Sequence, residues 1–165
     1  MRIVNLLLTA TLLALLGSFS SVAGAAEGAI KVTSIAQVEV EVIGKDGKKT
    51  LKRSPVDKAI PGTEVIYTTT FENTINKAVG NISINNPIPD NTEYKAGSAF
   101  GKDCEILFSV DGGKTFGYAE ALKTRGADGK EHPALPREYT HIRWNYKAQL
   151  PPGKSGEVGF RTVIK

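Results

Sequence analysis

The sequence predicts an all-β protein, an antiparallel β-sandwich, on three observations. Residues 64–72 alternate in side-chain character after a Pro61–Gly62 turn, which is typical of a strand with one buried and one solvated face. About eight to ten short stretches of this kind recur at regular spacing, with turn signals between them. After the first 25 residues, no long segment has the 3.6-residue period of an amphipathic helix.

The first 25 residues predict a signal peptide that is removed before folding. Arg2 is its only charge, residues 3–16 form an apolar run, and the small residues Ala23–Ala25 form a cleavage site. Cleavage after Ala26 fits nearly as well. An uncleaved membrane anchor is the alternative, but the run is short against the roughly 20 residues that a membrane-spanning helix needs. We therefore expect a secreted or periplasmic protein that is soluble and not inserted in a membrane after cleavage.

Charge and cysteine content narrow the classes of partner. The net charge is +4, and the basic residues clustered at 45–53 surround an Asp46–Gly47 turn without interleaved aromatic residues. A solvated hairpin turn explains this cluster better than a nucleic-acid or membrane surface, so no nucleic-acid partner is expected. Cys104 is the only cysteine, which excludes an internal disulfide. We expect it to be buried or half-buried at the start of a strand.

The segment 26–58 is expected to form an N-terminal strand and hairpin. Residues 29–43 alternate valines with polar side chains, which predicts a long half-buried strand. Residues 44–48 contain the Asp–Gly pair of a tight turn, and 49–53 form its short partner strand. We expect this unit to pack on a sandwich formed by residues 59–165.

The sandwich is expected to contain seven further strands. In one of them, Ile142, Trp144 and Tyr146 form the apolar face, which places the only Trp in the core. Residues 124–136 form the longest stretch without a strand pattern, and loops of this length are often functional or mobile. The predicted strands are 64–72, 81–85, 92–95, 105–110, 115–118, 139–147 and 157–164.

Several motifs together resemble a known family. The stretch Pro61–Thr74, with the pattern P-G-T-E-V-x-Y-T-x-T-F-x-N-T, Asn86–Tyr94 with its N-P-I-P-D, Gly97–Ser98 and the turn Leu150–Gly156 resemble the bacterial surface-protein repeat called domain of unknown function number eleven. The resemblance covers about residues 59–165. It implies an Ig-like β-sandwich exported by a bacterium, with no shared catalytic site. Members usually occur in many copies, whereas this chain holds one.

A second resemblance is local. Five residues fit the Asp-box pattern known from sialidase-like propellers, in which an Asp ties a hairpin turn away from the active site. One copy cannot build a propeller, so we interpret it as a structural hairpin, with a glycan-handling site as the alternative. Neighbouring acids are too few for a calcium shell at this Asp. The five residues are Ser109, Asp111, Gly113, Thr115 and Phe116.

No residue pattern indicates an enzyme. His132 and His141 are the only histidines, and no nucleophile or zinc-ligand spacing accompanies them. We expect no catalytic residue, no cofactor and no metal, and an envelope-associated module with a structural or protein-interaction role. A secreted glycan- or matrix-binding domain is the alternative, with Phe116, Tyr118 and Tyr139 as candidate contacts. A periplasmic enzyme or inhibitor is the third reading.

The expected partner is an envelope or extracellular protein or a glycan. The lysine-rich hairpin and residues 124–136 are the first places to look for it. Self-assembly is a further hypothesis, because the long strand at 29–42 can pair within its own domain or add to the open edge of a neighbour. Pairing within its own domain is the expected arrangement.

Overall fold

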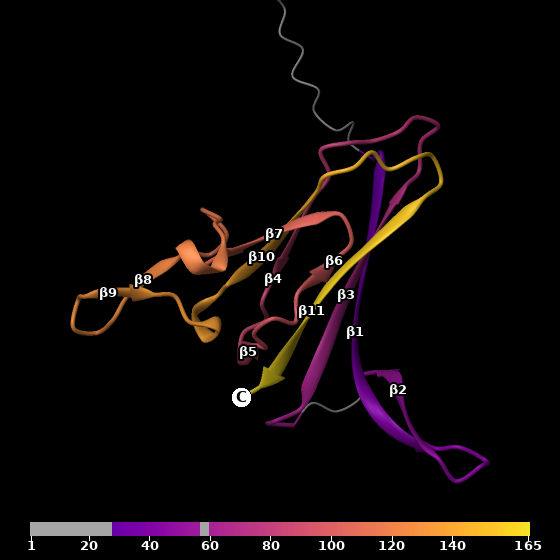
Figure 1. Cartoon of the computed structure of the whole chain (residues 1–165), viewed down its shortest axis with the longest axis horizontal. Coiled ribbons are helices and arrows are strands. Elements are labelled where there is room, and N and C mark those ends of the chain that lie inside the picture. The colour runs from indigo at the N-terminus through magenta and orange to yellow at the C-terminus, as the bar shows by residue number, and fades with distance from the viewer. Residues whose placement is uncertain (1–27, 57–59) are drawn as a thin grey trace, which may run out of the picture.

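The structure is a computed structural model that describes residues 28–56 and 60–165 (Figure 1). This part of the chain folds into antiparallel strands and two short 3₁₀ helices, so the predicted all-β class is confirmed. The predicted signal peptide, with its cleavage sites at Ala25 and Ala26, lies outside the described residues. No helix within 28–56 and 60–165 is long and apolar enough to cross a membrane.

The larger sheet carries the long strands. Its strand order is β2-β1-β3-β11-β5, and β6 pairs with β11 farther along the same edge. The N-terminal strand β1 is therefore hydrogen-bonded into the sheet through β3. The strands are β1 (Ile30–Ile43), β2 (Lys49–Pro55), β3 (Glu64–Asn73), β5 (Thr92–Tyr94), β6 (Phe100–Gly101) and β11 (Ser155–Ile164).

The smaller sheet and a short hairpin complete the fold. Strand β10 lies between β4 and β7 in the second sheet, and β8 and β9 form a separate two-stranded ribbon that extends to one side (Figure 1). The elements are β4 (Ser83–Pro87), β7 (Cys104–Ser109), η1 (Ala119–Ala121), β8 (Lys123–Arg125), β9 (Glu131–Pro133), η2 (Pro136–Glu138) and β10 (His141–Tyr146).

The core lies between the two sheets. Phe71, Val158 and Phe160 of the larger sheet and Ile142 and Trp144 of the smaller one are almost wholly buried in a single cluster. The rings of Trp144 and Phe160 lie 6.1 Å apart between centroids, so they join the two layers. Burial of this apolar surface is the main force holding the sheets together.

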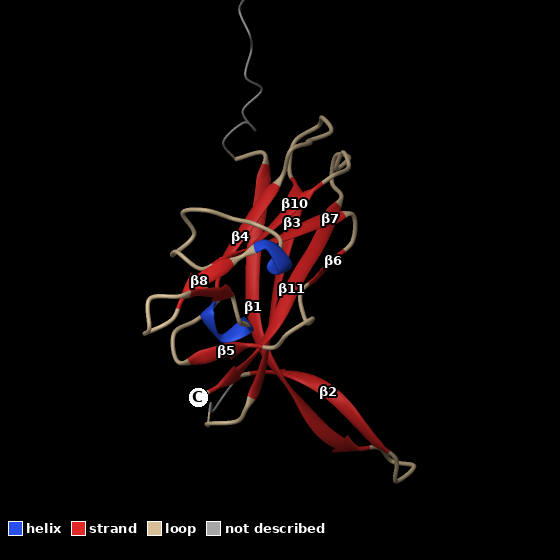
Figure 2. Cartoon of the chain, turned by 60° about the vertical axis from the view of Figure 1, so that its left-hand side comes forward, coloured by secondary structure: helices blue, strands red, loops and turns tan. Residues whose placement is uncertain are grey.

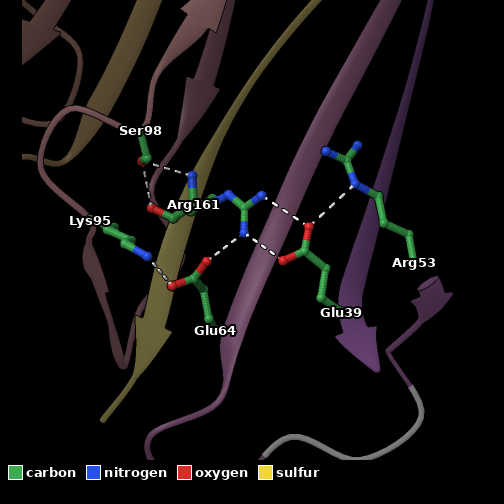
Figure 3. A network of polar contacts seen from close by, with 6 residues as sticks. All are labelled: Glu39, Arg53, Glu64, Lys95, Ser98 and Arg161. Carbon is green, nitrogen blue, oxygen red and sulfur yellow. Dashed lines mark hydrogen bonds and ion pairs between the residues drawn. The ribbon is translucent and has the colours of Figure 1, made fainter. Parts of the chain in front are cut away.

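The outer face of β3 is more buried than the alternation of its side chains predicts. Ile66 points away from the core, yet it is only 1% exposed. Arg161 of β11 lies directly opposite Ile66, and its side chain reaches across β3 (Figure 3). Farther along, a Cβ at Gly159 would lie 2.7 Å from the ring of Phe100, so that ring packs directly over Gly159 of β11. The long stem of an arginine can bury an apolar neighbour while its guanidinium stays hydrated.

Three element predictions are wrong in detail. Residues 115–118 form only an isolated bridge, from Gly117 to Phe108, because the preceding turn uses the backbone of Lys114 and Thr115. Residues 124–136 are not structureless, because most of β8 and all of β9 lie there. The strand expected at 81–85 is shifted to Ser83–Pro87, since pairing with β10 sets its ends.

Candidate interaction surface

Strand β1 has two halves with different neighbours. Ile30–Gln37 pairs with β3, whereas Gln37–Ile43 pairs with β2. The second half therefore leaves the body of the sandwich together with β2. Residues 38–55 form a projecting two-stranded hairpin, which we call the arm (Figure 2).

The first half of β1 has an unpaired side, which we call the open edge and define as residues 30–36. No strand in the described part of the chain pairs with it on the side away from β3. The backbone N–H of Thr74 donates to the Ala29 carbonyl at 3.0 Å, so odd-numbered residues point their backbone groups toward β3. The even-numbered residues of the open edge therefore point N–H and C=O groups outward. They are Ile30, Val32, Ser34 and Ala36.

Apolar side chains stand on both faces of the open edge. Val32 is 51% exposed on the face that continues the core, and Ile35 is 50% exposed on the outer face. The smaller sheet does not extend over Val32, although its cross-strand neighbour Phe71 is buried. An added strand would remove these two side chains from water.

The open edge is held in place by a chain of hydrogen bonds. The hydroxyl oxygens of Ser34 and Thr69 lie 2.8 Å apart, and the amide of Asn86 donates to Thr69 at 2.7 Å. These bonds link β1 and β3 of the larger sheet to β4 of the smaller one. The open edge is therefore connected by hydrogen bonds to both sheets.

The arm carries both apolar and basic residues. Val40, Ile43 and Leu51 are exposed on it, and the predicted turn at 44–48 closes it through a bond from the Gly44 N–H to the Lys48 carbonyl at 2.8 Å. The basic residues Lys45, Lys48, Lys49, Lys52 and Arg53 lie at its tip and along β2.

An ionic network ties the arm to the body (Figure 3). Arg161 of β11 contacts both carboxylate oxygens of Glu39 at 3.1 Å and donates to Glu64 at 2.6 Å. Glu64 also accepts from Lys95 at 2.5 Å, and Arg53 of β2 lies 3.9 Å from Glu39. Bidentate pairing of a guanidinium with a carboxylate fixes orientation as well as distance. The network therefore ties Glu39, at the base of the arm, to β11 of the sandwich body.

The network shifts the ionisation of its members. The hydrogen bond from Arg161 lowers the pKa of Glu39, and the bonds from Lys95 and Arg161 lower the pKa of Glu64. The two carboxylates in turn raise the pKa of the Arg161 guanidinium. Glu39, Glu64 and Arg161 therefore keep their charges at neutral pH.

The Asp-box residues lie together in one turn. The carboxylate of Asp111 accepts bonds from the Thr115 hydroxyl at 2.6 Å, the Thr115 N–H at 3.0 Å and the Lys114 N–H at 3.1 Å. Ser109 bonds the same carboxylate at 2.7 Å and accepts from the Gly113 N–H at 2.9 Å. These donors, led by Thr115, lower the pKa of Asp111. Its oxygens are directed into the turn itself.

The two histidines lie in different places. His132 lies 3.4 Å from the Thr124 hydroxyl and 3.8 Å from Glu138, but that hydroxyl donates to Glu138 at 2.8 Å. His141 lies under the Asp-box turn, where its ring would be 3.2 Å from a Cβ at Gly113. A groove of about 650 Å³ contains His141 and Glu138 but not His132. Within the ranges described, no three potential metal ligands cluster.

Cys104 begins β7 and is half-buried. Burial, with the negative charge of Asp103, raises the pKa of its thiol, which disfavours the reactive thiolate. Next to it, Glu105 accepts bonds from Lys147 at 2.7 Å, from Tyr118 and from Asn145 at 3.0 Å. These bonds lower the pKa of Glu105 to about 2.

The aromatic candidates for glycan contact are mostly engaged elsewhere. Tyr139 is buried in a cluster with Tyr94 and Phe108, and the Arg143 guanidinium lies 3.7 Å from the centre of the Phe116 ring. Tyr118 is exposed, but its hydroxyl bonds Glu105. They form no shared aromatic platform.

Comparisons of the chain with protein-family models, with curated proteins and with solved structures found no match. The resemblance to the surface-protein repeat therefore stays a prediction. The sequence suggested self-assembly through the strand at 29–42, but it did not show that residues 30–36 have an unpaired side. The signal for it was a mismatch of length, because a strand of 14 residues is followed by a partner of only 7.

Proposed function

We propose that this protein is an exported, non-catalytic interaction module of the bacterial envelope that binds an extended protein segment by strand addition at the open edge. The observation that carries the proposal is the open edge itself, with its four outward-facing residues and the half-exposed Val32 and Ile35. Export rests on the sequence pattern of the first 25 residues.

The physical basis is the hydrogen-bonding capacity of a sheet edge. Outward N–H and C=O groups bind any extended backbone, and the side chains on the two faces add selectivity. Proteins usually protect such an edge with proline or charged side chains. Residues 30–36 contain no proline and only one charge, Lys31, so the edge has little of this protection.

The test uses substitutions at Val32, whose N–H points outward. Val32→Pro removes that donor while leaving the ladder to β3 intact, and Val32→Thr is the matched control that keeps it. The mature protein is used to capture partners from an envelope extract, and cell fractionation checks export. We expect wild type and Val32→Thr to retain the same partner and Val32→Pro to lose it. Equal retention by Val32→Pro, confirmed as folded by circular dichroism, would refute strand addition.

A further inference from the structure

We infer that the segment received by the open edge is the open edge of a second copy of this chain, paired antiparallel about a two-fold axis. This inference rests on the proposed function, because it names the partner of the same site. A symmetric dimer places one surface against itself, so that surface must be self-complementary. The open edge meets this requirement in its backbone, its charge and its apolar side chains.

The backbone limits the registers in which two open edges can pair. In an antiparallel pair, outward-facing residues must lie opposite outward-facing residues. This condition is met when Val32 lies opposite Val32 of the second copy, and Ile30 lies opposite Ser34. Residues 30–34 of one chain then pair with the same residues of the other in reverse order, and a continuous sheet runs through both copies.

Neighbouring registers are excluded or shorter. Pro55 lies opposite Gln37 and occupies the position at which the open edge ends. If the second copy were shifted so that Val32 lay opposite its Ser34, its Ala29 would fall opposite Gln37, where Pro55 already lies. Ala29 cannot move aside easily, because its carbonyl accepts from the Thr74 N–H in its own sheet. A shift in the other direction leaves fewer residues paired. In the selected register Gly28, the first residue that the structure describes, falls opposite Ala36 and one position short of the site of Pro55, while its carbonyl accepts from the Thr74 hydroxyl of its own chain at 3.1 Å.

Side chains are compatible in this register. Lys31, the only charged residue of the open edge, falls opposite Thr33 of the second copy, so no like charges oppose each other. The two Val32 side chains lie side by side at the axis and shield each other from water. Because a contact of this length buries little area, we expect a reversible dimer that depends on concentration.

Cysteine cross-linking tests the register. Opposed residues of a hydrogen-bonded pair have Cα atoms about 5.5 Å apart, which suits a disulfide. With Cys104→Ser as background, we expect Val32→Cys to form a disulfide-linked dimer under mild oxidation. Ile35→Cys is the matched control, since Ile35 is 50% exposed and Val32 is 51% exposed. Its two thiols would lie six positions apart, on the order of 20 Å, so it should form no disulfide-linked dimer.

The outcomes separate this inference from the proposed function. Sedimentation of the wild type should show association that Val32→Pro abolishes. Failure of Val32→Cys to cross-link, or equal cross-linking of both variants, would overturn the two-fold pairing. Cross-linking can fail while the capture experiment still shows that Val32→Pro no longer binds a different envelope protein that the wild type binds. In that case strand addition stands, and only the second copy as the partner is refuted.

Discussion

At the residue scale, Asn73 shows how a polar side chain becomes part of the core. It is fully buried, and its amide donates to the carbonyls of Lys77 at 2.7 Å and Leu150 at 2.8 Å. Its side-chain oxygen accepts from the Ile75 N–H at 3.1 Å. A buried polar group is tolerated because its hydrogen bonds are satisfied. Asn73 thereby fixes the loop after β3 and the turn before β11.

Replacing Asn73 by Ala should lower the free energy of unfolding by roughly 1–3 kcal/mol, the usual cost of leaving a buried partner unsatisfied. Leu150 keeps the bond that its carbonyl accepts from the Val79 N–H, which limits the loss. Urea denaturation measures the change, and Asn76→Ala, in the exposed part of the same loop, is the control. Equal effects of the two substitutions would contradict the role assigned to Asn73.

Asp111 makes stability depend on pH. Its pKa is lowered in the folded protein, so the stability it contributes is present above the pKa of the unfolded chain and is lost as pH falls toward the folded pKa. Asp111→Asn should therefore melt at a lower temperature than wild type at pH 7, and the difference should shrink in acid, below about pH 4.

Melting curves followed by circular dichroism over a pH series measure this difference. Asp128→Asn is the control, because Asp128 lies in another exposed turn and accepts one backbone bond, from Lys130 at 3.1 Å. A difference between wild type and Asp111→Asn that stayed constant down to low pH would show that the carboxylate charge does not matter in the turn.

At the scale of elements, Arg161 links β11 to β1 and holds the arm. Arg161→Ala removes both carboxylate contacts, so we expect the amides of residues 38–54 to exchange hydrogen faster while the core strands keep their protection. Hydrogen exchange read by mass spectrometry measures the change. Arg143→Ala, on the other sheet, is the control and should leave the arm unchanged. Unaltered exchange of the arm in Arg161→Ala would show that its direction is set by backbone pairing alone.

Element prediction succeeded where pattern and turn chemistry agreed. The strands at 29–43, 64–72 and 157–164 and the turn at 44–48 are present within a few residues of their predicted limits. Prediction failed at 115–118 and 124–136, where short segments have no apolar period of their own. Strand formation at such segments depends on the partner that tertiary folding supplies.

At the scale of the whole molecule, Trp144 reports on the packing of the two sheets. It lies in the smaller sheet, is fully buried, and contacts Phe160 of the larger one. We expect blue-shifted emission that resists quenching by acrylamide until the protein unfolds. Unfolding curves from fluorescence and far-ultraviolet circular dichroism should coincide, because one core serves both sheets. Separate transitions would mean that the sheets do not unfold as one unit.

The sequence by itself determined the all-β class, the long strands, the apolar face of Trp144 and the half-burial of Cys104. Each depends on neighbouring side chains, whose alternation and turn residues are local properties of the chain. Only the tertiary structure decided that β2 covers half of β1, that Arg161 shields Ile66, and that the arm projects. These features depend on which distant segments lie side by side, and alternation within one strand does not specify its neighbour.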